Sequence, residues 1–263
     1  MRYGLCMGIN DYPGDENDLS GCLNDVNDTA QLLTKRGFSV NTLVDAAATR
    51  AGILGQMRAV LQAAVAHDSV VISFSGHGTW MPDIDGDEPD HRDEAWCPYD
   101  FEDAVVLDDE IYATITTYKQ PDVRLLLIAD SCHSGTVCRA VGPDLGPKAR
   151  PRFMPPSRLP QYKTLAQVAA TRDAPPRGKV QEVPGTVLLA GCTDREVSYD
   201  AVFHDRPNGA LTYFALSTLA KLPVGVTYDA WYKAIRKRLP NPEYPQTPQL
   251  VCPVAARSWR AVT

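Results

Sequence analysis

The run Ser69-Val70-Val71-Ile72-Ser73-Phe74, which leads into Ser75-Gly76-His77-Gly78, decides the fold class of this chain. An uninterrupted apolar run that stops at a glycine-rich turn is typical of a strand buried on both faces. Two further runs of this kind lie at residues 123–129 and 186–190. Buried strands that alternate with amphipathic helices predict an α/β fold with a mostly parallel sheet.

The other elements of the expected sheet follow from hydrophobic periodicity. We expect strands at residues 2–9, 39–44, 69–74, 123–129, 186–190 and 249–253. We expect helices at residues 22–36, 49–66, 209–222 and 228–239. Ligands bind at the carboxyl ends of the strands in such sheets. The polar residues that follow the three buried strands, at 75–78, 130–135 and 191–194, therefore mark the expected site.

Composition bounds the function classes. The chain has 263 residues, of which 44% are hydrophobic, and a formal net charge of −6. The acidic balance argues against nucleic acid as a partner, and no apolar run approaches the roughly 20 residues of a membrane helix. Seven scattered cysteines without a secretory leader pattern favour reduced thiols in a cytoplasm. We expect a single domain over residues 1–263.

Two segments of the chain carry opposite charge. Residues 83–110 are rich in Asp and Glu, and Arg92 is their single Lys or Arg. Residues 140–180, called the basic excursion below, are rich in proline and contain these bases: Lys148, Arg150, Arg152, Arg158, Lys163, Arg172, Arg177 and Lys179. Charge blocks of this kind are commonly solvated loops. A long insert without its own secondary structure is usually functional or disordered.

His77 and Cys132 have the residue types of a nucleophilic pair. A cysteine attacks a carbonyl only as thiolate, and a nearby imidazole takes its proton and later delivers it to the leaving amine. His133 is a poorer base, because adjacent residues of an extended chain point to opposite sides. The backbone N–H groups of Gly78 and Cys132 are candidates for an oxyanion hole. A lone cysteine at a strand end is otherwise most often a small buried hydrophobe.

Ser75-Gly76-His77-Gly78 together with Asp130-Ser131-Cys132-His133-Ser134-Gly135 resembles the metacaspases, a family of caspase-like cysteine peptidases. Supporting segments match the family in order at residues 19–26, 191–194, 209–213 and 246–249. The Gln-Ala-Cys-x-Gly segment of true caspases is absent. The resemblance covers most of the chain except the basic excursion. It implies a caspase-like three-layer sandwich with a six-stranded sheet, and a monomer whose chemistry needs no cofactor.

The resemblance also implies what is cut. Metacaspases cleave after Arg or Lys because their first pocket is acidic, and the family's pocket positions correspond here to Cys22, Asp25, Ser75 and Asp130, called the acidic pocket below. Independently, a carboxylate two residues before the nucleophile would line this pocket and favour a guanidinium through charge-assisted hydrogen bonds. Asp25 is equally suited to the first turn of a helix, and the two roles are compatible.

Calcium activation and a zymogen form are two further implications. Asp93, Asp108 and Asp109 match family calcium ligands, and carboxylate oxygens suit this hard cation. A fourth acid expected shortly after the nucleophile is replaced by Thr136-Val137-Cys138-Arg139. We hypothesise that the basic excursion covers or threads the acidic cleft until a peptidase cuts it. A disordered surface loop is the alternative.

Two other functions compete with this interpretation. A catalytically silent caspase-like scaffold would bind partners through the same fold, but it would have no reason to keep His77, Cys132 and the pocket acids. A metal site made of Cys132, His133 and His77 would need a fourth ligand, and none lies at a usual spacing. The sequence therefore predicts a cysteine endopeptidase acting on protein substrates with Arg or Lys at the cleavage site.

Overall fold

The computed structural model describes residues 1–84, 86, 91–132, 149–170, 183–193 and 196–263. Its centre is a six-stranded sheet in the order β12-β9-β7-β3-β1-β2. The strands are β1 (Arg2–Gly8), β2 (Ser39–Val44), β3 (Ser69–Ser75), β7 (Arg124–Asp130), β9 (Thr186–Ala190) and β12 (Gln249–Val251). All neighbouring strands are parallel except β12 and β9. The predicted α/β class and mostly parallel six-stranded sheet are confirmed.

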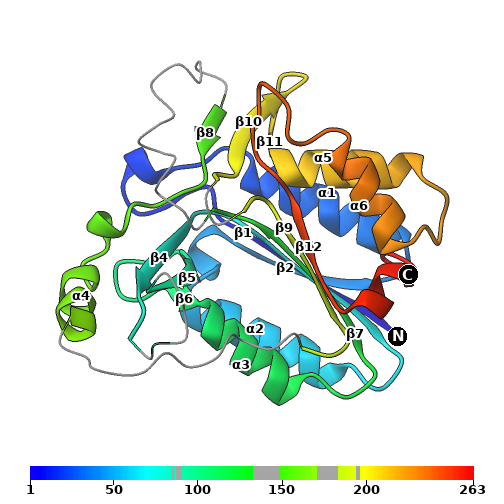
Figure 1. Ribbon diagram of the computed structural model, residues 1–263, viewed down its shortest axis with the longest axis horizontal. Helices are drawn as coiled ribbons and strands as arrows, with labels where there is room; N and C mark the ends of the chain where they lie inside the picture. The colour runs from blue at the N-terminus through cyan, green and yellow to red at the C-terminus, as the bar shows by residue number, and fades with distance from the viewer. Residues whose placement is uncertain (85, 87–90, 133–148, 171–182, 194–195) are drawn as a thin grey trace.

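Helices cover both faces of this sheet (Figure 1). One face carries α1 (Cys22–Lys35), α5 (Ala210–Lys221) and α6 (Tyr228–Arg236), and the other carries α2 (Arg50–Ala63) and α3 (Asp108–Tyr118). Because successive strand residues point to opposite faces, Leu5 and Met7 pack with α2 and α3, whereas Cys6 packs with α1, α5 and α6. The fold is the three-layer sandwich that we expected.

Several elements were not predicted. A small antiparallel sheet follows His77 and consists of β4 (Gly78–Pro82), β5 (Arg92–Trp96) and β6 (Val106–Leu107). A second one consists of β8 (Ala149–Pro151), β10 (Tyr199–Phe203) and β11 (Arg206–Gly209). Short 3-10 turns are η1 (Asp15–Asn17), η2 (Asp45–Ala47), η3 (Pro156–Arg158) and η4 (Val254–Ser258).

The two charged segments contain secondary structure. In the acidic one, helix α3 begins with Asp108, Asp109 and Glu110, acids that are favourable at a helix N-terminus. In the basic excursion, the described part, 149–170, contains β8, η3 and α4 (Tyr162–Ala170). The expectation of a structureless insert is therefore wrong for this part. Four of its bases lie outside the described residues: Lys148, Arg172, Arg177 and Lys179.

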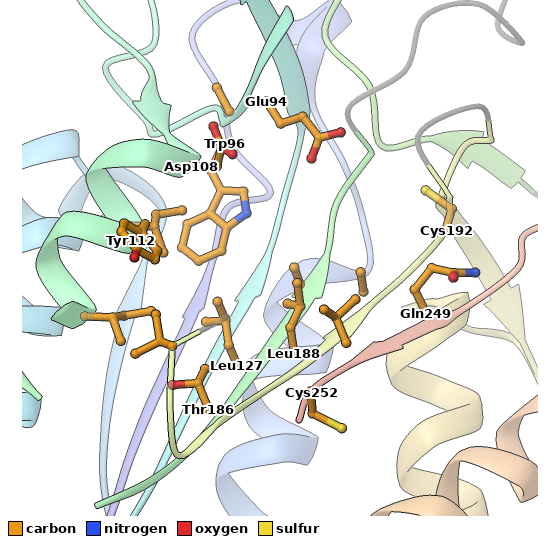
Figure 2. Close-up of a pocket in the computed structure, with 17 residues that line it drawn as sticks. Glu94, Trp96, Asp108, Tyr112, Leu127, Thr186, Leu188, Cys192, Gln249 and Cys252 are labelled. Atoms are coloured by element: carbon orange, nitrogen blue, oxygen red, sulfur yellow. The ribbon is translucent and has the colours of Figure 1, made fainter. Parts of the chain in front are cut away.

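A separate apolar cavity of about 400 Å³ lies between α3 and the strands β7, β9 and β12 (Figure 2). Trp96, Leu127 and Leu188 line it, and Glu94 and Asp108 lie at one end. Its lining includes no member of the acidic pocket. Among the described helices, none has both the length and the apolar character required to span a bilayer.

Candidate active site

The strand ends of β3 and β7 bring His77 and Cys132 to the same edge of the sheet. Ser75 and Asp130 are register partners, and each candidate residue follows its strand two positions later. Gly78 packs directly against the nucleophile segment: a Cβ at position 78 would collide with the carbonyl oxygen of Cys132. Glycine permits this close backbone approach, and the backbone next to His77 therefore packs against the backbone of Cys132.

The His77 imidazole is buried, with a hydrogen-bonding pattern that fixes its tautomer. Nε2 lies 2.7 Å from the carbonyl oxygen of Asn17. Because a carbonyl oxygen only accepts, Nε2 carries the hydrogen and Nδ1 carries the lone pair. Nδ1 has no hydrogen-bond partner among the described residues. Burial lowers the pKa of His77 to about 4, against an opposing effect of the Asn17 hydrogen bond. The ring is therefore neutral near pH 7, with its basic nitrogen unengaged.

The Cys132 thiol is buried between two neighbours that come from the segment after β9. Its Sγ lies 3.1 Å from the carbonyl oxygen of Glu196, to which the thiol donates. Cys192 is the second neighbour. A hydrogen bond with Cys132, together with burial, raises the pKa of Cys192 well above its ordinary value. Cys192 is therefore a neutral thiol and does not compete with Cys132 as a thiolate nucleophile.

The carbonyl group of Arg152 lies between the two backbone donors proposed for the oxyanion hole. Its oxygen accepts hydrogen bonds from the backbone nitrogens of Gly78, at 3.0 Å, and Cys132, at 3.2 Å. An oxyanion hole is a pair of fixed donors aimed at the oxygen on which negative charge develops. The basic excursion thus places one of its own peptide carbonyls between these two backbone donors.

The side chain of Arg152 fills the acidic pocket and is completely buried. Its Nη2 donates to Asp25 Oδ2 at 2.7 Å and to Asp200 Oδ1 at 2.9 Å. Its Nη1 donates to Ser75 Oγ at 3.0 Å and to the Asp130 carbonyl oxygen at 3.1 Å, and lies 3.4 Å from Asp130 Oδ2. Three carboxylates therefore surround one guanidinium.

Polar neighbours hold two of these carboxylates in place. Asp25 accepts from the backbone nitrogen of Gly209, and Asp130 accepts from Ser198 Oγ at 2.5 Å and Thr212 Oγ1 at 2.8 Å. Burial raises the pKa of Asp25 to about 6, although the Arg152 cation opposes that shift. Burial lowers the pKa of Arg152, but the surrounding acids outweigh this and raise it well above its ordinary value. The guanidinium remains charged inside the protein.

Cys22 also belongs to this group of buried residues. Its pKa is raised well above the ordinary value, first by burial, while the Arg152 cation acts in the opposite direction. The structure thus gathers all four members of the acidic pocket around Arg152.

The residues on both sides of Arg152 continue as an extended peptide. β8 pairs with β10 in antiparallel fashion, and the Arg152 nitrogen donates to the Ser198 carbonyl oxygen at 2.9 Å. After Arg152, the Met154 nitrogen donates to the Gly78 carbonyl oxygen at 2.9 Å. Addition of a strand to a sheet edge is a general mode of peptide recognition. The segment 149–154 is held in this way by backbone hydrogen bonds to the segment of β10 and to Gly78.

Two other arginines attach this segment to η1, the turn that also holds His77. The Arg150 guanidinium donates to the carbonyl oxygens of Glu16 and Asp18. Arg158 Nη1 donates to Asn17 Oδ1 at 2.5 Å. The basic excursion therefore contacts the candidate active site through backbone and side chains on both sides of Arg152.

Sequence reasoning missed several residues of this site, among them Asn17, Glu196, Ser198 and Asp200. Asp200 and Ser198 lie beyond the matched segment 191–194, and Asn17 contacts His77 through its backbone carbonyl, which no side-chain pattern encodes. Charge balance was the available signal, but it pointed to the acids of residues 83–110, whereas the acids that contact Arg152 lie outside that segment. It could not indicate which base enters the pocket.

The proposed calcium ligands lie elsewhere. Asp93 is on β5, and Asp108 and Asp109 form the first turn of α3. Within the described ranges, no three His, Cys, Asp or Glu side chains are grouped so as to hold a metal ion. Residues 85 and 87–90 of the acidic segment, and residues 136–139 and His133, lie outside the described part. Calcium binding stays a prediction.

Comparisons with known proteins identify the family to which this chain is similar. A family model described as "Metacaspase, peptidase C14 domain" matches residues 2–140. Metacaspase-1B of Aspergillus oryzae is 32% identical over 95% of this chain and 67% of its own length. Metacaspase-1 of Saccharomyces cerevisiae is 30% identical over 95% of this chain and 66% of its own length. The chain thus spans about two thirds of the length of these fungal proteins.

A solved protein structure has a similar fold. The crystal structure of a protein from Geobacter sulfurreducens superposes with a TM-score of 0.76 and 31% sequence identity, and the match covers 100% of this chain and 98% of that one.

Proposed function

We propose a function for this chain, which belongs to the metacaspase family of cysteine-type peptidases: it is an endopeptidase that cuts proteins after Arg or Lys, with His77 and Cys132 as its catalytic pair. The observation that carries the proposal is the position of Arg152. Its guanidinium lies among three buried carboxylates while its carbonyl oxygen accepts from Gly78 and Cys132. One residue thus occupies the side-chain pocket and the carbonyl site together.

The chemistry follows from the groups present. The Nδ1 atom of neutral His77 takes the proton of the Cys132 thiol, and the sulfur attacks the carbonyl carbon of the bound basic residue. The N–H groups of Gly78 and Cys132 stabilise the oxyanion that forms. His77 then gives the proton to the leaving amine, and a thioester with Cys132 results. Water hydrolyses the thioester and restores the thiol.

Paired peptide substrates test this proposal. We expect fluorogenic peptides that end in Arg to be cleaved by the wild-type protein, and the matched peptides that end in Asp to be left intact, because three carboxylates repel an acidic side chain. Cys132→Ala should abolish cleavage. Cys252→Ala is the control and should retain cleavage. Cys252 is also a buried thiol, but it follows β12 and is not part of the proposed site.

Two results would contradict the proposal. Cleavage of the Asp peptides in preference to the Arg peptides would exclude the proposed pocket. Equal activity in wild type and Cys132→Ala would exclude the nucleophile. Failure of either protein to cleave any peptide, after the basic excursion has been cut, would favour the scaffold function instead.

We propose in addition that the protein is a zymogen, activated by cleavage of the bond between Arg152 and Phe153. With Arg152 in place, the acidic pocket is filled and substrate is excluded. The same position brings the Arg152 carbonyl against Cys132, since its oxygen accepts a hydrogen bond from the Cys132 nitrogen. Cleavage would release the new N-terminus that begins with Phe153. The pocket could then exchange Arg152 for the side chain of a substrate.

Location, oligomeric state and calcium complete the proposal. Six cysteines of the described residues are buried thiols outside any disulfide, which suits a reducing cytoplasm: Cys6, Cys22, Cys97, Cys132, Cys192 and Cys252. We propose a cytoplasmic monomer. Calcium is proposed as an activator through Asp93, Asp108 and Asp109, and repeating the peptide assay with calcium and with a chelator tests that role.

A further inference from the structure

We propose that Asp200 makes the acidic pocket selective for arginine over lysine. The inference rests on the function proposed above, in which this pocket receives the residue before the cleaved bond. Asp200 reaches the pocket from β10, the strand that also pairs with the bound segment β8. It adds a third carboxylate to those of Asp25 and Asp130.

The contacts of the guanidinium are confined to its two terminal nitrogens. Nη2 donates to Asp25 and Asp200, and Nη1 donates to Ser75 and the Asp130 carbonyl. Nε, although buried, has no hydrogen-bond partner among the residues that the structure describes. A side chain that reached only as far as Nε and Cζ would therefore make none of these hydrogen bonds.

Lysine is such a side chain. Its Nζ follows the same number of bonds from Cα as arginine Cζ, so from the same backbone position it ends about one C–N bond, ~1.3 Å, before the atoms that touch the carboxylates. A shift toward Asp25 and Asp200 moves the ammonium away from Asp130, and the reverse shift leaves Asp200 without a cation. Buried charges without a partner are strongly unfavourable. The planar guanidinium of arginine contacts Asp130 through one terminal nitrogen and Asp25 and Asp200 through the other.

Asp200 is held too firmly to follow a shorter side chain. Its Oδ1 accepts from the backbone nitrogen of Gly21 at 2.9 Å, and its Oδ2 accepts from that of Ser20 at 2.8 Å. The carboxylate is buried, with 6% of the residue exposed. An acceptor that is fixed at the position of Nη2 distinguishes the longer arginine side chain from the shorter lysine side chain. A mobile acceptor would move to contact either cation.

Kinetics with matched peptides test the selectivity. Peptides that differ only by Arg or Lys before the cleaved bond are compared on wild type, Asp200→Asn and the control Asp205→Asn. Asp205 is an exposed acid in the turn of the same hairpin, with a φ of 62° that asparagine tolerates. We expect wild type to prefer Arg by about 10- to 100-fold in kcat/KM, the range set by one hydrogen bond between charged groups. Asp200→Asn should lose most of that preference, and Asp205→Asn should keep it.

The pattern of loss distinguishes selectivity from structural damage. Asp200→Asn should lower kcat/KM for the Arg peptide by about 10- to 100-fold and for the Lys peptide by less than about 3-fold. An equal loss for both peptides would mean that Asp200 acts only by holding the Ser20–Gly21 turn, and would overturn the proposal.

A second measurement needs no catalysis. In the Cys132→Ala protein, Arg152→Lys is made with and without Asp200→Asn, and the four unfolding equilibria are compared. We expect Arg152→Lys to raise the unfolding constant by about 10- to 100-fold when Asp200 is present and by less when it is replaced. Additive effects would overturn the role of Asp200. Coupling without cleavage of any peptide would instead contradict the proposed peptidase function and leave the pocket assignment standing.

Discussion

The backbone nitrogen of Cys132 donates a hydrogen bond of 3.2 Å to the carbonyl oxygen of Arg152. The nucleophile segment is thus engaged with a peptide bond of the same chain. The guanidinium of that same residue is fully buried among Asp25, Asp130 and Asp200. In the proposed function, this arginine occupies both the substrate pocket and the oxyanion site, and other substrates enter only after it leaves.

Removal of the pocket cation should destabilise the protein. In a Cys132→Ala background, Arg152→Ala leaves three buried carboxylates without their partner, and we expect the free energy of unfolding at pH 7 to fall by about 3–5 kcal/mol. Arg158→Ala, which removes an exposed arginine that contacts Asn17, should lower it by less than about 1 kcal/mol. Urea unfolding measures both. Similar losses in the two variants would contradict the buried charge cluster.

Gly209 forms part of the wall around the guanidinium. A Cβ at this position would collide with the Asp130 carboxylate and the Arg152 guanidinium. We expect Gly209→Ala to lower kcat/KM for an Arg peptide by about 10- to 100-fold, the equivalent of about 1–3 kcal/mol of overpacking. Gly55→Ala, in the α2 helix with no atom within 4 Å of its added Cβ, should leave the activity unchanged. An active Gly209→Ala enzyme would show that substrate arginine binds elsewhere.

The lowered pKa of His77 predicts a specific dependence of stability on pH. The unfolded chain takes up a proton on His77 near the ordinary pKa of about 6.5, whereas the folded protein keeps the ring neutral down to about 4. Acidification therefore favours unfolding, starting below pH 6.5. Between pH 7 and pH 5 we expect this residue to remove about 2 kcal/mol from the free energy of unfolding.

His77→Gln isolates that contribution. Both proteins carry Cys132→Ala. Between pH 7 and pH 5, the free energy of unfolding of the His77→Gln variant should fall by about 2 kcal/mol less than that of its parent. Asp25, whose pKa is raised to about 6, acts in the opposite direction because the folded state gains its proton first. That effect is present in both proteins and cancels in the comparison. Identical losses would contradict a neutral, buried imidazole.

Arg150 should affect the rate of processing and not its position. Its guanidinium donates to two carbonyl oxygens of the η1 turn, beside Asn17 that binds His77. Because the contact is exposed, we expect Arg150→Ala to slow cleavage after Arg152 by about 2- to 10-fold. Lys163→Ala, on the exposed face of α4, should not slow it. Gel densitometry over time gives both rates, and cleavage of Arg150→Ala at the wild-type rate would contradict a role of this contact.

The sheet and its strand ends could be predicted because their signals are local. The apolar runs of β3, β7 and β9 have the length and composition of buried strands, and the parallel order of such strands places their carboxyl ends together. His77 and Cys132 follow these ends at equal offsets. Asp130 could be placed in the acidic pocket from its position two residues before Cys132, but Asp25 could be assigned to it only through the resemblance to a family, because α1 brings Asp25 there from a distant part of the chain.

The occupant of the pocket could not be predicted. Arg152 is one of several bases in the basic excursion, and its selection depends on the register of β8 against β10, which no local pattern encodes. Asp200 is set by the same pairing. Helix α3 was missed for another reason: its first turn consists of acids, which look like a solvated loop when counted as charge but stabilise a helix N-terminus.

Sequencing of the new N-termini that form when the purified protein is incubated tests the central claim most directly. We predict a fragment that begins with Phe153 in the wild-type protein and no such fragment in Cys132→Ala. Full activity on Arg peptides while the bond after Arg152 stays intact, or the same cleavage in Cys132→Ala, would contradict it.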